Sequence, residues 1–394
     1  FHFKKFPDDE IECVMTRGEK YLDSGSRNPV TKFAPIMEDA SRRDLTINAL
    51  YYNISKKKVE DLIGCGVQDI RDGVLRVPME MVSEQMVDHT FIDDPLRILR
   101  VLRFHTKLGF KISDETFNAM KRNVDRLSII TVERINTELC KILMSKYARQ
   151  GIELINEIGA MKYVIPELEQ CIGLGQNSYH FGDVWVHTMA VLENHCNLFE
   201  PDLICRLAAL LHDIGKIECR TVDEHGRVHF YEHEFVGSDV AKGILQRLKF
   251  DNNTIDEVCF IIRNHMRAKG FDNDCCKMKE KSINKFMYTC GNKERFLRTC
   301  QVIEADNLAH EKSHCITGQY ARFVECVKTS KMFGYRLPIN GDDVINEFGI
   351  EPGPIIKEIL KQVMNNVYSN PDISRESCLK LMKQAYKNVL KQKQ

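Results

Sequence analysis

The chain has 394 residues, which is enough for two or three domains of ordinary size. Hydrophobic residues make up 43% and charged residues 28%, and no apolar run approaches the roughly 20 residues of a membrane helix. The formal net charge is zero. These values exclude a mini-protein, argue against a membrane protein and favour a folded globular chain.

The balanced charge hides two positive segments. Residues 97–149 contain 12 Lys and Arg against 5 Asp and Glu, and residues 355–394 contain 8 against 3. Each excess fits an anionic partner, and each also fits a solvated helical face. The 15 cysteines include no C-x-x-C pair and follow no secretory signal, so we expect reduced thiols in a cytoplasmic protein and no zinc knuckle. Because the chain starts at Phe1, organelle targeting stays open.

Strand patterns precede helical ones. Residues 10–17 (EIECVMTR) and 45–54 (LTINALYYNI) are rich in β-formers and end in polar turns, which predicts two strands. From Pro95 onward nearly every segment has helical periodicity, with Gly and Pro interruptions near 109, 159, 166, 173–175, 334–341 and 349–354. The sequence therefore predicts an α+β protein, with a small α/β head followed by an extended all-α neck, body and tail.

The stretch EDASRRDLTINAL, residues 38–50, concentrates charge before an expected strand. An isolated Arg-Arg-Asp usually forms a surface ion-pair turn, but arginine forks also bind phosphates through several hydrogen bonds. Further on, Asp94 suits a helix N-cap and Pro95 the first turn of that helix. Arginines then recur at every third position, on a face distinct from the leucines, at Arg97, Arg100 and Arg103.

These motifs, in this order, resemble the class II tRNA nucleotidyltransferases, the CCA-adding enzymes, and their relatives the bacterial poly(A) polymerases. The matching stretches are RRDLTINAL (42–50), a D…G…D turn (61–69), DDPLRILRVLRF (93–104) and TVERINTEL (131–139), and the resemblance covers almost the whole chain. It implies addition or repair of the 3′-terminal CCA of tRNA with CTP, ATP and Mg²⁺. It also implies nucleotide contacts from Arg42, Arg43, Asp44, Asp93, Asp94, Arg97, Arg100 and Arg134.

The resemblance assigns the base reading to Asp93, Asp94 and Arg97, with Asp93 in place of the family's Glu. An aspartate accepts a hydrogen bond from an exocyclic amine while an arginine donates to a ring nitrogen or carbonyl, a pairing that accepts C and A and rejects U and G. A plain cap is the simpler role of Asp94, and the two roles are compatible. The helix around Glu133 and Arg134 matches a further family motif that supports the nucleotide pocket.

The sequence departs from the family at its front. The family carries a glycine-pair turn and an Asp-x-Asp that hold two catalytic Mg²⁺ ions, and this chain has no G-G followed by D-x-D. Glu12 fits a third carboxylate of such a site and equally fits an exposed strand residue. We expect the missing part to lie before Phe1, which makes the head incomplete; a degenerate, inactive head is the alternative.

A second group of residues has the chemistry of a metal site. Imidazoles and carboxylates recur on several expected helices, at His187, the adjacent His212 and Asp213, His233, His265 and Asp306. This pattern resembles the HD phosphohydrolase superfamily, which some bacterial CCA-adding enzymes carry. The resemblance implies a divalent ion such as Ni²⁺, Mn²⁺ or Mg²⁺ on His187, His212, Asp213 and Asp306, with His233 and His265 available for a second metal or the scissile phosphate. Lys216 fits phosphate neutralisation, although a solvent-facing lysine is the simpler expectation.

Four domains are expected: an incomplete nucleotidyltransferase head (1–82), a base-recognition neck (83–166), an HD phosphohydrolase domain (167–315) and a helical, tRNA-binding tail (316–394). The expected partners are tRNA, CTP and ATP, with the oligomeric state left open. An RNA-end phosphohydrolase or RNA-binding protein with an inactive head is the first alternative. A poly(A) polymerase is the second, although LLHDIGK, residues 210–216, counts against it.

Overall fold

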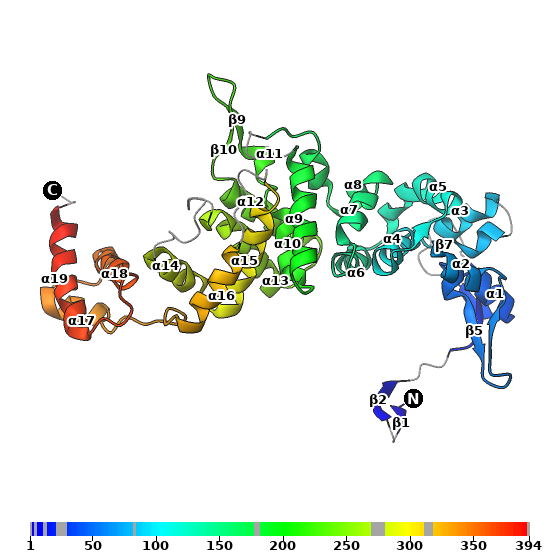
Figure 1. The fold of residues 1–394 in the computed structure, drawn as a ribbon, viewed down its shortest axis with the longest axis horizontal. Coiled ribbons are helices and arrows are strands. Elements are labelled where there is room, and N and C mark those ends of the chain that lie inside the picture. Colours follow the sequence, from blue (N-terminus) through cyan, green and yellow to red (C-terminus); the bar gives the residue numbers. More distant parts are fainter. Residues whose placement is uncertain are drawn as a thin grey trace.

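The chain forms an elongated molecule in which a head that contains strands is followed by helices (Figure 1). The structure is a computed structural model, which describes residues 2–3, 6–10, 14–20, 30–81, 84–176, 182–268, 280–310 and 318–391. The chain runs from the head at one end, through a helical neck and body, to a helical tail at the other end. The predicted α+β class is confirmed.

The head consists of short strands and small helices. Its strands form separate antiparallel pairs, β1–β2, β3–β4 and β5–β6, while β7 pairs in parallel with β8 of the neck. The elements are β1 (His2–Phe3), β2 (Phe6–Glu10), β3 (Arg17–Lys20), β4 (Val30–Phe33), α1 (Ile36–Ser41), η1 (Thr46–Asn48), β5 (Leu50–Asn53), β6 (Lys58–Asp61), α2 (Gly66–Asp72) and β7 (Val74–Leu75).

Both predicted strands are shorter than expected. The strand predicted over 10–17 is wrong in its described part, because β2 ends at Glu10, residues 14–16 have no regular structure and β3 starts at Arg17; residues 11–13 lie outside the described residues. In the strand predicted over 45–54, residues 46–48 form a 3₁₀ turn instead. The physical reason is the Asp44 carboxylate, whose Oδ1 accepts hydrogen bonds from the Leu45 amide and from Asn48 Nδ2 and so bends the chain.

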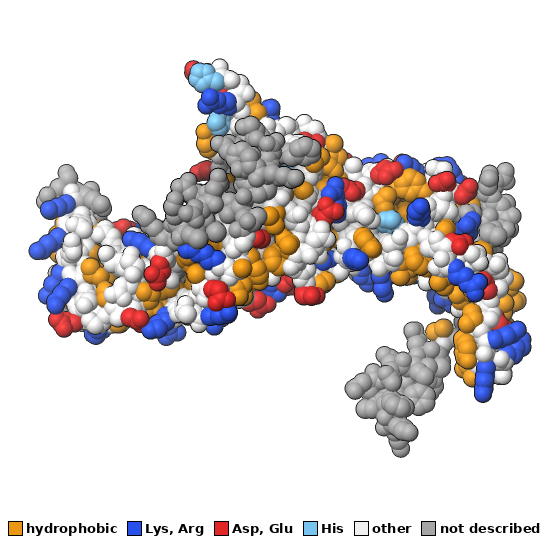
Figure 2. Space-filling model, viewed as in Figure 1, with side chains coloured by type: hydrophobic (Ala, Val, Ile, Leu, Met, Phe, Trp, Pro, Cys, Tyr) orange, Lys and Arg blue, Asp and Glu red, His pale blue; other side chains and the backbone are white. Residues whose placement is uncertain are grey.

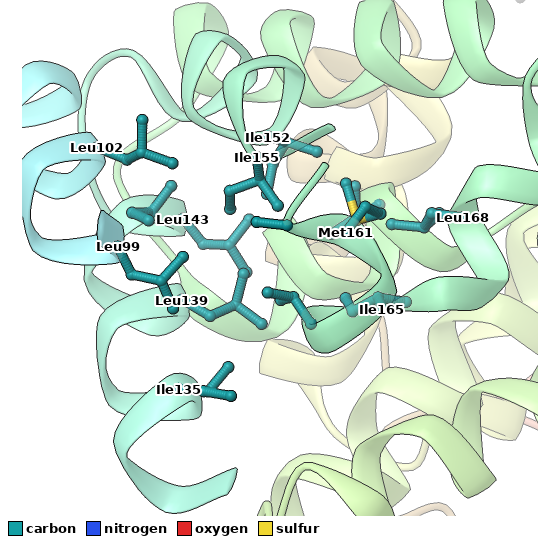
Figure 3. Close-up of a cluster of buried hydrophobic side chains, with 14 of the residues drawn as sticks. Leu99, Leu102, Ile135, Leu139, Leu143, Ile152, Ile155, Met161, Ile165 and Leu168 are labelled. Atoms are coloured by element: carbon teal, nitrogen blue, oxygen red, sulfur yellow. The ribbon is translucent and has the colours of Figure 1, made fainter. Parts of the chain in front are cut away.

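The neck is a group of helices with a continuous apolar core. Leucines of α4 (Leu96–Leu108) pack against the apolar faces of α6 (Val132–Leu143) and α7 (Ala148–Glu157), as Figure 3 shows. The i, i+3, i+4 spacing of these apolar residues explains why the helices bury one face. The short 3₁₀ helix η2 (Pro78–Met81) ends the head, and the other elements of the neck are α3 (Glu84–Asp93), β8 (Lys111–Ile112), α5 (Asp114–Asn123), η3 (Val124–Ile129) and α8 (Met161–Val164).

The start of α4 differs from the prediction. The N-cap position is Pro95, not Asp94, and no side chain caps it. Asp94 lies one residue earlier, where its Oδ1 accepts a hydrogen bond of 3.2 Å from the Leu96 amide. The aspartate therefore still satisfies one of the free amides at the helix start, from outside the cap position.

The body is a bundle of helices with one projecting hairpin. Helix α10 (Leu203–Leu211) is buried from Ile204 to its end, and it packs against α9 (Val184–Leu198), α13 (Asn252–Asn264) and α15 (Lys293–Asn307). Strands β9 and β10 form the hairpin that projects at the top of Figure 1. The other elements are η4 (Pro166–Cys171), α11 (Lys216–Cys219), β9 (Arg220–Val222), β10 (Val228–Phe230), α12 (His233–Arg247), η5 (His265–Ala268) and α14 (Glu280–Cys290).

The described buried side chains form two large cores. One core runs from Leu45 in the head to Val302 in α15, and the other joins α14 and α15 to the tail helices. Those tail helices are α16 (Gln319–Thr329), α17 (Gly341–Phe348), α18 (Pro354–Val367) and α19 (Arg375–Lys391). Among the described helices, none combines the length and apolar character needed to cross a membrane.

Candidate functional site

The adjacent arginines of the head are held by a carboxylate that sequence reasoning did not single out. Asp39 of α1 is buried, and its Oδ1 accepts from Arg42 Nη2 at 2.5 Å while its Oδ2 accepts from Arg43 Nη2 at 2.8 Å. The Tyr51 hydroxyl donates to the same Oδ2 at 2.6 Å. The arginine pair therefore has one shared anchor. The signal in the sequence was Asp39 itself, three and four residues before the arginines, a helical spacing.

Asp44, the acid that follows the arginines, faces the neck. It is buried, and its Oδ2 accepts two hydrogen bonds from Arg100 of α4, from Nε at 2.8 Å and from Nη2 at 2.6 Å. Burial by itself raises the pKa of Asp44, but the charge of Arg100 and a hydrogen bond from Asn48 outweigh it, so the pKa lies below its ordinary value. This ion pair fastens the head motif to the helix that carries the next motif.

The predicted base-reading residues lie together at the start of α4. Arg134 of α6 donates from Nη2 to both carboxylate oxygens of Asp94, at 3.0 and 3.3 Å. Arg97 is buried, and its Nη1 donates to the Thr90 carbonyl at 3.3 Å. Asp93 is the last residue of α3 and is half-buried. The fold thus brings together Asp94 and Arg134, which lie 40 residues apart in the sequence. Glu12, the predicted catalytic carboxylate, lies outside the described residues.

The histidines and aspartates of the body converge at the centre of the bundle. His187 of α9 places Nε2 3.1 Å from Asp306 Oδ1 of α15 and 3.3 Å from His212 Nε2 at the end of α10. His233, at the start of α12, and His265, after α13, place their Nε2 atoms 3.3 and 3.8 Å from Asp213 Oδ1. All six side chains are buried.

Among the described residues, these groups divide into two possible metal-binding sets. Ligand atoms of His187, His212 and Asp306 lie within 4.8 Å of one another, as do those of Asp213, His233 and His265. Asp213 also approaches the first set, because its Oδ2 lies 3.1 Å from His212 Nε2. The two oxygens of Asp213 therefore face different sets.

The ring orientations favour metal binding through Nε2. In three of the rings Nδ1 lies within hydrogen-bond distance of a backbone carbonyl: His212 with Ala209 at 2.9 Å, His233 with Phe230 at 2.8 Å and His265 with Ile262 at 2.6 Å. A hydrogen on Nδ1 leaves the lone pair on Nε2, the tautomer that binds a metal.

The charges of the site fit a divalent cation. Burial lowers the pKa of His187 to about 4, so this imidazole is neutral at neutral pH. Burial alone raises the pKa of Asp213, but His212 and Lys216 outweigh it and hold the pKa well below its ordinary value. A neutral imidazole such as His187 and an ionised carboxylate such as Asp213 are donors that divalent metal sites use.

Two further residues of this site were missed or misplaced from the sequence. Lys216, expected to face solvent, is buried instead; its Nζ lies 2.7 Å from Asp213 Oδ2 and 2.6 Å from Gln176 Oε1. Lys216 follows Asp213 by three residues, and the turn before α11 brings the two side chains together. His310 was not singled out, yet its ring lies edge-on to His187 with 5.3 Å between centroids.

Comparison with known proteins finds matches in three parts of the chain. Three family models match: "Poly A polymerase head domain" at residues 2–76, "Probable RNA and SrmB-binding site of polymerase A" at 109–172, and "HD domain" at 184–305. Fold and matches together define a nucleotidyltransferase that carries an HD domain.

The relatives specify the family. A CC-adding tRNA nucleotidyltransferase of Thermus thermophilus is 28% identical over 88% of this chain and 77% of its own length. An A-adding tRNA nucleotidyltransferase of Deinococcus radiodurans is 29% identical over 82% of this chain and 73% of its own. The crystal structure of the Bacillus stearothermophilus CCA-adding enzyme in complex with CTP shares the fold, with a TM-score of 0.66 and 21% identity over 96% of this chain and 79% of that one. The chain belongs to the class II CCA-adding tRNA nucleotidyltransferases.

Proposed function

We propose that this chain adds nucleotides of the CCA sequence to the 3′ end of tRNA, with CTP and ATP as substrates. The observation that carries the proposal is the Asp44–Arg100 ion pair, which joins the arginine pair of the head to the helix of the base-reading residues. A nucleotide whose phosphates lie at Arg42 and Arg43 then has its base near the start of α4. Arginine forks suit the phosphates, and the Asp94–Arg134 pair offers an acceptor and donors to a base.

The described head does not fit the catalytic Mg²⁺ ions that the family uses. Among the described residues, the groups of three close ligands lie in the body, none in the head, and the sequence has no G-G followed by D-x-D. We therefore derive no metal step at this site. The residues present bind and orient the nucleotide.

The tail is the proposed docking surface for tRNA. Residues 355–394 have 8 Lys and Arg against 3 Asp and Glu, and Figure 2 shows lysine and arginine side chains spread over the tail end of the molecule with acidic ones between them. Phosphate contacts from such a surface release counterions, so tRNA affinity should fall steeply with added salt.

The test is extension of a tRNA transcript that ends at the nucleotide before CCA. The chain is assayed with CTP, with ATP and with both, and products are resolved to one nucleotide. A chimera in which the Asp-x-Asp segment of a CCA-adding relative precedes Phe1 is assayed beside it. Addition of C, C and A by the chimera supports the proposal, addition of CC or A alone places the chain with the CC-adding or A-adding relatives, and a run of A from ATP alone identifies a poly(A) polymerase.

We also propose a second activity, the hydrolysis of RNA-end phosphoesters at the HD site. The two buried ligand sets, with Asp213 of one set 3.1 Å from His212 of the other, favour it, and a bound divalent ion would supply a Lewis acid and an activated water. Lys216, held 2.7 Å from Asp213 Oδ2, keeps one positive charge at that carboxylate. The expected substrates are 2′,3′-cyclic phosphates and 2′-nucleotides, with Ni²⁺, Mn²⁺ or Mg²⁺.

The second activity is tested by hydrolysis of a 2′,3′-cyclic nucleotide with each metal. His187→Ala and His233→Ala each remove one ligand of a different set and should abolish hydrolysis while tRNA binding persists. If neither the chain nor the chimera extends tRNA, yet both bind tRNA and hydrolyse the cyclic end, the HD site is the working enzyme and the polymerase proposal fails.

A further inference from the structure

Asp39 joins four parts of the head. Besides its contacts with the two arginines and Tyr51 of β5, its Oδ1 accepts from the backbone amide of Arg17 on β3 at 3.2 Å. Arg42 Nε reaches the same oxygen at 3.1 Å and the Arg17 carbonyl at 2.7 Å. The Asp39 side chain is 3% exposed. A buried carboxylate with five hydrogen bonds has little freedom to move.

The Asp39 carboxylate lies between the positive charges of Arg42 and Arg43 and holds both side chains. Two guanidinium groups this close repel each other, and a negative charge between them reduces the repulsion. Arg42 binds Oδ1 and Arg43 binds Oδ2, so one carboxylate fixes the separation of the two side chains. The trio keeps a net charge of plus one, which still attracts a phosphate.

Arg43 retains donors for a ligand. Only its Nη2 contacts Asp39, and its Nε is buried without a hydrogen-bond partner among the described residues. The side chain is 39% exposed. Because Nε is buried, a phosphate oxygen can reach only the exposed part of the guanidinium group, beyond the nitrogen that Asp39 holds.

We propose that Asp39 is a positioning residue that holds Arg42 and Arg43 side by side for the triphosphate of the incoming nucleotide. This inference rests on the nucleotidyl transfer proposed above. Asp44, the acid within the Arg-Arg-Asp motif, does not take this role, because its charge pairs with Arg100. Fixing the arginines before the nucleotide arrives lowers the entropy lost on binding.

The experiment measures the binding of CTP, CDP, CMP and cytidine by calorimetry in the full chain. Asp39→Asn keeps the size of the side chain but removes its charge and turns one acceptor into a donor. CTP affinity should fall about tenfold or more, CDP and CMP progressively less, and cytidine less than about twofold. Binding of tRNA should not change. Ser41→Ala, in the same helix α1, removes a hydrogen bond to the Met37 carbonyl and no contact of Asp39, and should leave the ratio of CTP to cytidine affinity intact.

Arg43→Ala separates failure of this inference from failure of the proposed function. If Arg43→Ala weakens CTP binding and Asp39→Asn does not, the inference is overturned and the function stands. If Arg43→Ala leaves CTP binding unchanged, phosphate binding by this pair fails, and the inference fails with it. An equal loss for all four ligands, with a lower thermal midpoint, would assign Asp39 a purely structural role. Should Asp39→Asn not fold, Asp39→Glu, which displaces the charge by one methylene, must show the same graded loss.

Discussion

Replacement of Gly215 by alanine should weaken metal binding at the HD site, because the new Cβ would clash with backbone atoms of α12. Gly215 lies in the turn after Asp213, against the first turn of α12. A Cβ there would stand 2.3 Å from the His233 carbonyl oxygen, 2.4 Å from the Gly237 nitrogen and 2.8 Å from the Gly237 Cα. All three are backbone atoms, so no side chain can rotate away. Relief requires the two segments to separate by about 1 Å to reach van der Waals distance.

The size of that displacement sets the expected loss of stability and of metal affinity. Overpacking of this kind costs about 1–3 kcal/mol of stability. It also moves His233, whose Nε2 lies 3.3 Å from Asp213 Oδ1, and metal sites tolerate about 0.2 Å in ligand distance. We expect metal affinity of the set that contains Asp213, His233 and His265 to fall at least about tenfold.

The assay is calorimetric titration of the chain with Mn²⁺, together with the thermal midpoint and the hydrolysis of a cyclic nucleotide. Gly243→Ala, on the same helix α12, is the matched control, because a Cβ there meets no atom within 4 Å. It should leave metal binding intact and stabilise the helix by up to about 1 kcal/mol. Wild-type Mn²⁺ binding by Gly215→Ala would refute the reasoning.

Three further predictions each concern one titratable side chain. Asp44→Asn removes the partner of Arg100 and should lower stability by about 2–3 kcal/mol at pH 7; because the pKa of Asp44 lies below its ordinary value, this stabilisation is present above about pH 4 and is lost as the pH falls further, so the thermal midpoints of wild type and variant should stay apart above about pH 4 and converge only below it. Asp94→Ala should relax the choice among CTP, ATP, UTP and GTP in the extension assay, and retained discrimination would mean that Asp94 serves only its contacts with Arg134 and the start of α4. Burial, with the nearby positive charge of Arg206, lowers the pKa of His195 from 6.5 to about 4, so the folded state resists its protonation and loses about 2 kcal/mol between pH 7.5 and 5. His195→Gln should reduce that loss in urea titrations at the two pH values, and an unchanged pH dependence would contradict it.

Local sequence patterns were sufficient for the order of elements. Helical periodicity after Pro95 and strand-like composition before it gave the head and the helical body, because each depends on residues close in sequence. The patterns failed where a side chain reached back to its own backbone. At residues 46–48 the Asp44 carboxylate stabilises a 3₁₀ turn, which β-propensity cannot indicate.

Residue types determined which side chains enter the candidate sites, since imidazoles, carboxylates and arginine forks have their chemistry wherever they lie. Only the tertiary structure decided how they combine. It placed Asp213 between two ligand sets and buried Lys216 against that aspartate. It also paired both Arg42 and Arg43 with Asp39. These contacts join different helices and strands, and their distances depend on how the helices pack. The sequence therefore determined which chemical groups this protein has, and the packing of its helices and strands determined which of those groups contact one another.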